Sequence, residues 1–174
     1  MGQYEISGSN RKFCLPPIVD ERTRLLVLGS LPGDQSLGER RYYANPRNQL
    51  WGIIGRLIAC PLVDYRYARR LEICKHYGIG FWDVLESAER SQSLDSQLRR
   101  ISANDLISLA TTLPSLRAIG FNGVTAARIG RRSLQDRSEW TLIDLPSTSP
   151  AYTLAYDKKL SAWQSILPHI HFLT

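Results

Sequence analysis

Short apolar runs alternate with longer stretches of helical character along this chain, and this alternation restricts the possible folds more than any other feature. Four runs have strand-like composition and are bounded by turn residues or helical segments: 24–28, 79–85, 116–121 and 140–145. Strands that alternate with helices pair in parallel through right-handed crossovers. The pattern therefore predicts an α/β fold, a three-layer α/β/α sandwich around a central four-stranded, mainly parallel sheet.

The segments between these runs show apolar residues at helical spacing or end at helix-stopping residues. We expect helices over 49–59, 64–76, 104–113, 124–134 and 156–167, irregular backbone up to about residue 20, and a loop with a short helix over 86–102. No linker of Pro, Gly and Ser divides the 174 residues, so we expect a single domain, 1–174. The first ten residues are polar, and no segment has the apolar length that spans a bilayer. We therefore expect a cytoplasmic protein of bacterial or archaeal type without membrane association.

The charge balance is basic, with 22 Lys and Arg against 16 Asp and Glu and a net charge of +6. Arginine guanidinium groups fork onto two phosphate oxygens at once, so one explanation is a polyanionic partner. The other is a surface charge that merely keeps the protein soluble. Arg40, Arg41 and Arg47 gather in one loop, which favours the first. Three separated cysteines and three histidines form no ligand set, so we expect buried thiols and no metal.

The functional residues should gather where the predicted parallel strands end, because ligands bind outside the carboxyl ends of such strands. A long polar and aromatic loop, 29–51, follows the first strand, and loops of this length usually carry function. Asp83 and Asn122 end two further strands, and a serine-rich loop, 146–152, follows the fourth. No histidine stands at these ends, so a Ser-His-Asp triad is excluded there.

Five ordered blocks in these regions resemble the uracil-DNA glycosylase superfamily, most closely its DNA-deoxyinosine (hypoxanthine) glycosylase branch. The blocks are 29–33 with 36–37, 42–48 with Trp51, 77–84, 121–123 and 145–151. The resemblance implies a monofunctional glycosylase that flips a deaminated base out of DNA and removes it hydrolytically without a cofactor. The branch that the chain resembles most closely implies that this base is hypoxanthine. The resemblance also implies a monomeric protein whose partner is double-stranded DNA containing a deaminated base, with single-stranded DNA as a further form of the substrate.

The same resemblance assigns roles to individual residues. It implies catalytic roles for Asn48 and Ser30, base binding by Tyr43, Asp83, Gly29, Leu31 and Asn122, and DNA binding by Arg47, Ser147, Thr148, Ser149, Pro150, Ala151 and Tyr152. Mismatch-specific members carry Asn where this chain has Leu31, so Asn48 is the expected substitute. The histidine that many relatives carry in the serine-loop motif is absent, which leaves backbone N–H groups near Ser30 or Leu31 to stabilise the leaving base.

The chemistry of these side chains is consistent with such roles but leaves alternatives. A carboxylate at Asp83 accepts hydrogen bonds only, so it would accept the N1–H of hypoxanthine and repel the N1 lone pair of adenine. Asn48 is equally suited to cap the following helix, and Tyr43 to pack in the core. Three other functions stay open: a uracil or mismatch-specific (G:U or G:T) glycosylase, a non-catalytic lesion-binding module, and a nucleotide-binding protein. The last ranks lowest because a phosphate cradle needs a basic or hydroxyl partner inside the turn, and Leu31 and Pro32 supply neither.

Overall fold

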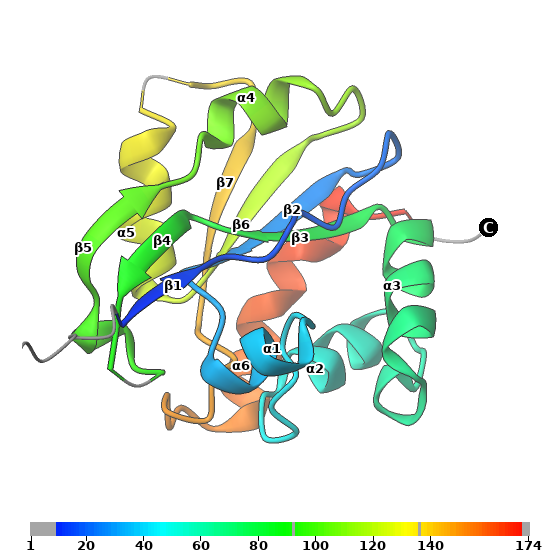
Figure 1. Ribbon diagram of the computed structural model, residues 1–174. Coiled ribbons are helices and arrows are strands. Elements are labelled where there is room, and N and C mark those ends of the chain that lie inside the picture. Colours follow the sequence, from blue (N-terminus) through cyan, green and yellow to red (C-terminus); the bar gives the residue numbers. More distant parts are fainter. Residues whose placement is uncertain (1–9, 92, 136, 172–174) are drawn as a thin grey trace, which may run out of the picture.

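A parallel four-stranded sheet forms the centre of the protein, whose computed structural model describes residues 10–91, 93–135 and 137–171 (Figure 1). Its strands lie in the spatial order β3-β2-β6-β7, and every neighbouring pair is parallel. They are β2 (Leu25–Gly29), β3 (Ile79–Asp83), β6 (Ala118–Asn122) and β7 (Thr141–Leu145). The predicted α/β fold is confirmed. Residues 1–9, which belong to the polar segment at the start of the sequence, lie outside the described residues.

Helices cover both faces of this sheet, as Figure 1 shows. One face is covered by α4 (Leu106–Thr111) and α5 (Val124–Ser133), the other by α2 (Leu50–Leu57), α3 (Tyr67–His76) and α6 (Tyr156–Trp163). The short α1 (Asp34–Glu39) follows β2 inside the long loop, and 3₁₀ turns span Leu62–Asp64, Asp95–Gln97 and Gln164–His169. No described helix is long and apolar enough to cross a membrane.

The central strand β2 shows why the sheet needs a helical layer on each side. Leu25 and Val27 belong to the core beneath α2, α3 and α6, whereas Leu26 and Leu28 belong to the core beneath α4 and α5. All four are fully buried. Side chains alternate between the two faces of a strand, so a continuous apolar run can be buried only between two layers.

A second sheet corrects two sequence-based expectations. β1 (Arg11–Phe13), β4 (Leu85–Glu89) and β5 (Arg99–Ala103) form an antiparallel sheet in the order β1-β4-β5. We expected irregular backbone before residue 20 and a loop over 86–102. The expectation of a loop over 86–102 failed because β5 is mostly exposed and contains two arginines, so it lacks the apolar pattern that identifies a strand. Its pairing depends on a distant segment. The thiols also differ from expectation, since Cys74 is buried but Cys14 and Cys60 are partly exposed.

The strand order places a crevice at one end of the parallel sheet. Strand β3, which follows β2 in the chain, lies next to β2 on one side, and β6 lies next to β2 on the other side. Connections therefore leave β2 and β6 in opposite directions at their carboxyl ends, which is where ligands bind in open α/β sheets. These ends carry Gly29 and Asn122.

Candidate functional site

A small pocket of about 120 Å³ lies at this crevice. It is formed by the ends of β2, β3 and β6, the loop before α2 and the loop after β7. Residues identified from the sequence that line it are Gly29, Ser30, Leu31, Tyr43, Asn48, Asp83, Asn122, Ser147, Thr148 and Ser149. Arg47, Pro150, Ala151 and Tyr152 lie outside the lining. The fold therefore gathers most of the predicted site residues in one place, and we call this cavity the base pocket.

Asp83 is a buried acid in this pocket, with 3% of its surface exposed. Burial raises the pKa of Asp83 to about 8, with Arg90 lowering it and Asp95 raising it further. Its Oδ2 is buried without a hydrogen-bond partner among the described residues. Because the acid form predominates at pH 7, Asp83 can donate as well as accept a hydrogen bond. The sequence-based interpretation of Asp83 as a carboxylate therefore applies only above about pH 8.

Gly29 allows Asp83 and Tyr43 to converge at the end of β2. A Cβ atom at this position would lie 2.7 Å from Asp83 Oδ1 and 3.4 Å from Tyr43 Oη. The first distance is shorter than any ordinary contact, and Asp83 has no room to retreat because it is buried. Glycine is needed here for close approach of side chains to the backbone.

Tyr43 is held in a strained backbone conformation, with φ of 54°. A left-handed conformation costs a residue other than glycine on the order of 1–3 kcal/mol and is often found at functional sites. Its ring packs edge-on against Trp51 and Phe81, with centroid distances of 6.3 and 6.1 Å. Its Oη is buried without a partner in the described chain, and burial raises the Tyr43 pKa. Packing thus orients the ring, while the hydroxyl is not part of a structural hydrogen bond.

Asn48 lies one residue before Gln49, the N-cap residue of α2, and its side chain still satisfies an N–H group of the first helical turn, as the capping alternative requires. Its Oδ1 accepts a hydrogen bond of 3.0 Å from the Leu50 backbone N–H. That bond identifies the oxygen, since only the oxygen can accept from an N–H. The NH₂ group has no protein acceptor within the described residues. Asn48 therefore combines a cap with a free donor beside the pocket.

Asn122 lines the pocket and is hydrogen-bonded to the serine-rich loop, and its expected contact with the base stays a prediction. Its Nδ2 donates to Thr148 Oγ1 and its Oδ1 accepts from the Thr148 N–H, both at 2.9 Å. Thr148 is fully buried, and its carbonyl accepts from the Gln49 N–H at 3.0 Å. Asn122 is thus occupied in positioning the serine-rich loop between the end of β6 and the start of α2.

Helix α6 holds the same loop from the other side. Trp163 Nε1 donates to the Pro146 carbonyl at 2.9 Å, and the buried Lys159 ammonium donates to the Tyr152 carbonyl at 2.8 Å. Both ends of the loop are therefore fixed. Within it, Ser147 Oγ and Ser149 Oγ accept from the N–H groups of Ser149 and Ala151, both at 3.2 Å, and the Tyr152 ring is half-exposed. A loop that is preorganised in this way loses less conformational entropy when a ligand binds.

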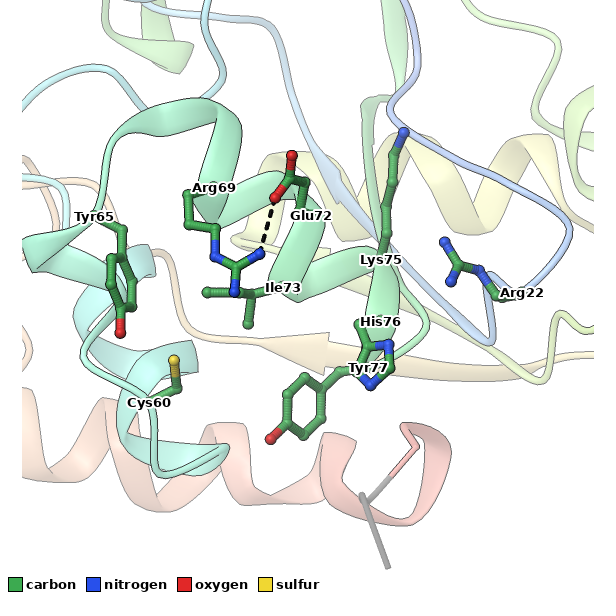
Figure 2. A pocket seen from close by; sticks show the side chains of 9 residues that line it. All are labelled: Arg22, Cys60, Tyr65, Arg69, Glu72, Ile73, Lys75, His76 and Tyr77. Atoms are coloured by element: carbon green, nitrogen blue, oxygen red, sulfur yellow. Dashed lines mark hydrogen bonds and ion pairs between the residues drawn. The ribbon is translucent and has the colours of Figure 1, made fainter.

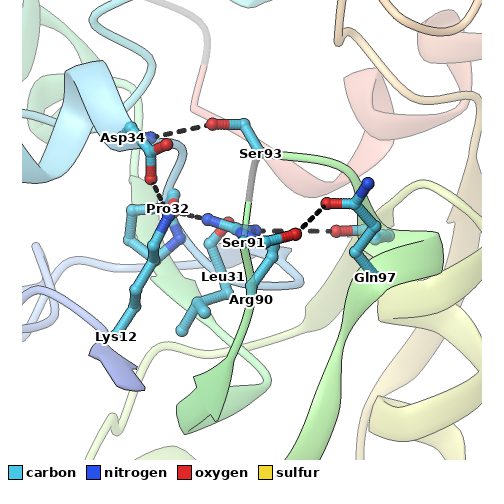
Figure 3. Close-up of polar contacts among 9 residues, drawn as sticks. Lys12, Leu31, Pro32, Asp34, Arg90, Ser91, Ser93 and Gln97 are labelled. Carbon is cyan, nitrogen blue, oxygen red and sulfur yellow. Dashed lines mark hydrogen bonds and ion pairs between the residues drawn. The ribbon is translucent and has the colours of Figure 1, made fainter. Parts of the chain in front are cut away.

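Sequence reasoning missed a buried arginine behind the pocket, which Figure 3 shows. Arg90, 1% exposed, donates to the carbonyls of Leu31 (3.4 Å) and Pro32 and lies 4.0 Å from Asp95 Oδ1. Asp95 Oδ1 in turn accepts from Ser30 Oγ at 2.6 Å and lines the pocket. This network fixes the turn after β2 from the second sheet. It was missed because 86–102 was expected to be a loop.

Comparison with known proteins identifies the family. The family model described as the uracil DNA glycosylase superfamily matches residues 16–169, which include every element that lines the base pocket. The chain belongs to the uracil DNA glycosylase superfamily. The family assignment made from the five sequence blocks is confirmed.

Two Methanosarcina proteins and one solved Methanosarcina structure are similar to this chain over most of its length. A protein of Methanosarcina acetivorans named hypoxanthine DNA glycosylase is 36% identical over 154 residues, which is 88% of this chain and 96% of the relative. A protein of the same name from Methanosarcina barkeri is 37% identical over 113 residues, 65% of this chain and 72% of the relative. A solution NMR structure of a Methanosarcina acetivorans protein assigned as a uracil DNA glycosylase superposes with a TM-score of 0.81 at 35% identity, covering 91% of this chain and 98% of that one.

Proposed function

We propose that this superfamily member is a monofunctional DNA glycosylase that removes hypoxanthine from DNA by hydrolysis. One observation carries the proposal: the base pocket contains a buried carboxyl group, Asp83, whose acid form predominates at neutral pH. A neutral carboxyl group presents a donor O–H beside an acceptor C=O. Hypoxanthine presents the matching pair, its N1–H and its O6. The names of the two archaeal relatives support the same substrate.

Uracil is the second candidate substrate because its N3–H and O4 form the same donor and acceptor pair. Adenine would pair with the neutral acid by exchanging the roles of donor and acceptor, so Asp83 alone does not reject it. Opening the duplex provides the additional selection, since a mispaired base costs less to flip than a Watson–Crick paired one. In this proposal the deaminated base is therefore selected mainly by the lower cost of flipping it, while Asp83 holds its lactam edge once it is in the pocket.

Catalysis in this proposal uses groups that line the base pocket. Tyr43 stacks on the flipped base, a contact worth about 1–3 kcal/mol. The free NH₂ of Asn48 holds the attacking water, and the backbone N–H groups of Ser30 and Leu31 face the leaving base. In the described chain neither N–H donates to a protein acceptor. The bond between C1′ and the base breaks with both electrons going to the base, water adds to C1′, and its proton ends on the released base.

DNA is held in the proposal by the serine-rich loop and by Arg47. The hydroxyls of Ser147 and Ser149 contact backbone phosphates, and the exposed Tyr152 ring enters the space that the flipped nucleotide leaves. Arg47 is exposed and adjoins the pocket residue Asn48, so its guanidinium is available to the backbone. Every group named comes from a single chain, which fits action as a monomer on duplex or single-stranded DNA.

A substrate panel tests the proposed activity. Labelled duplexes and single strands, each with one hypoxanthine, uracil, xanthine or G-paired thymine, are incubated with excess protein and cleaved at abasic sites with alkali. We expect the fastest release from deoxyinosine. Fastest release from uracil or from G-paired thymine would favour the alternative glycosylase. Specific binding of deoxyinosine DNA without release of any base would favour the non-catalytic module.

A further inference from the structure

A second hollow, of about 360 Å³, lies directly beside the base pocket. Tyr43, Asn45 and Asn48 line both cavities, so the loop 29–51, which we call the active-site loop, forms a partition between them. The other walls come from the segment 63–70, which leads into the first turn of α3, and from Trp51 of α2. We call this hollow the arginine groove, because its lining includes the three guanidinium groups of Arg41, Arg66 and Arg70 against one carboxylate, Glu39.

The three arginines are only weakly neutralised. Arg41 lies 3.7 Å from Glu39, and both side chains are exposed, so the pair contributes little. Arg66 and Arg70 form no ion pair with any residue that the structure describes. Arg66 is exposed at the start of α3, where its side chain is accessible to a ligand. The groove therefore carries an unbalanced positive charge.

Aromatic contacts fix the groove's shape and tie it to the active-site loop. Arg70 donates to the carbonyls of Tyr65 (2.8 Å) and Val63 (2.9 Å), and its guanidinium lies 5.5 Å from the Trp51 ring centroid. Trp51 Nε1 donates to the Tyr43 carbonyl at 3.2 Å, and Tyr67 Oη accepts from the Tyr42 N–H at 2.9 Å. These contacts connect the walls of the groove directly to Tyr42 and Tyr43, which line the base pocket.

We infer that the arginine groove binds a backbone phosphodiester of the DNA strand that carries the target base. Guanidinium groups match phosphate geometry and sign, and the groove shares its wall with the pocket for the flipped nucleotide. A strand with one nucleotide in the base pocket has its neighbouring phosphates close to that wall. Arg41 and Arg66 make the contact, while Arg70 shapes the site. The inference rests on the proposed action on DNA.

Helix α3 supplies a matched control on its other side. Arg69 follows Arg66 by less than one turn but lines a different hollow, together with Arg22, Lys75 and His76 (Figure 2). There it pairs with Glu72 at 3.0 Å, and its side chain is 61% exposed. Removal of Arg69 changes the net charge of the protein by the same amount as removal of Arg66, but it leaves the arginine groove intact.

The test measures affinity for 5′-labelled oligonucleotides at several salt concentrations, with Arg66→Ala, Arg41→Ala and Arg69→Ala compared with the parent. Loss of one phosphate contact should reduce the salt slope by about 0.7 on single strands and 0.9 on duplex. Between 50 and 200 mM salt, one contact corresponds to about a threefold difference in the loss of affinity. We expect this change for Arg66→Ala and Arg41→Ala and not for Arg69→Ala. Equal effects of all three would overturn the inference, because net charge alone would then explain them.

Oligonucleotides with the target base near one end or the other distinguish the source of the phosphate. If the groove holds the lesion strand, the effect of Arg66→Ala persists on single strands and disappears when the strand is shortened on one side of the base. An effect confined to duplex DNA would assign the groove to the complementary strand and contradict the inference. Because binding is measured without turnover, a parent that binds DNA but releases no base would refute the proposed activity and leave this test decisive.

Discussion

The replacement of Asp83 by Asn tests the central feature of the base pocket, a carboxyl group that stays protonated at neutral pH. Asn has nearly the same shape and offers a similar pair of one donor and one acceptor to a base, but it cannot ionise. Any property that depends on the titration of Asp83 should therefore change with pH in the parent and not in Asp83→Asn. Both folding stability and base excision depend on this titration.

The effect on stability follows from proton linkage. Burial raises the Asp83 pKa to about 8 in the folded protein, against about 3.9 in an unfolded chain. Between these values the folded state holds a proton that the unfolded state has released, so unfolding releases a proton and stability falls as pH rises. The stability that the raised pKa of Asp83 provides is fully present below about pH 4 and is lost as pH rises through about 8. The slope is at most about 1.4 kcal/mol per pH unit, or about 4 kcal/mol between pH 5 and pH 8.

Thermal melting of both proteins from pH 5 to pH 9 measures this difference. We expect the melting temperature of Asp83→Asn, relative to the parent, to rise by about 8–16 °C between pH 5 and pH 8, because about 1 kcal/mol shifts the melting temperature of a domain of this size by about 2–4 °C. Above about pH 8.5 the difference should become constant. Parallel curves for the two proteins over the whole range would show that Asp83 is ionised in the folded state and would refute the reasoning.

Excision provides the second measurement with the same variant. In the parent, ionisation of Asp83 removes the donor that faces O6, so single-turnover release of hypoxanthine should decline as pH rises through about 8. Asp83→Asn should lack this decline. The base's own ionisation affects both proteins equally, so the variant serves as its control. A decline of equal size in both proteins would assign the titration to another group.

Three further predictions follow from the pocket. Asn48→Ala should lower the rate of single-turnover excision by about 10²–10³-fold while DNA affinity is retained. Loss of the hydrogen bond to the Leu50 N–H should cost about 1 kcal/mol of stability in melting experiments. Excision at the parental rate would leave Asn48 with a capping role alone. Gly29→Ala should destabilise the protein by about 1–3 kcal/mol and reduce excision, because the new Cβ meets Asp83 Oδ1 at 2.7 Å; a normal melting curve with normal excision would contradict this packing. Arg90→Met should cost about 1–3 kcal/mol for each buried carbonyl left unpaired, measured by urea unfolding, and an unchanged midpoint would show that the carbonyls of Leu31 and Pro32 do not depend on it.

Local patterns were sufficient for the parallel sheet and for most residues of the pocket. The strands 25–29 and 118–122 are short apolar runs that end at glycine or asparagine, and parallel pairing places all such ends on one edge. Gly29, Asp83 and Asn122 were therefore predictable as neighbours even though many residues separate them in the chain. Their individual roles in binding or catalysis stay predictions.

The second sheet could not be read from the sequence in the same way. Strand β5 is exposed and charged, and what stabilises it is pairing with β4, including Arg100 with Glu89 at 3.1 Å. Cross-strand partners leave no periodic signal within one segment. Arg90 was missed for the same reason, because only the folded chain places the carbonyls of Leu31 and Pro32 against its guanidinium.

Neighbouring positions along the chain are enough to show which residues are apolar, where strands end and which side chains stand at those ends. The chemical state of those side chains depends instead on contacts that form only when the chain is folded. Asp83 is protonated at neutral pH because distant elements exclude water from it, and Asn122 is occupied because Thr148 lies against it. Solvation and hydrogen bonding depend on every atom nearby in space, whatever its position in the chain.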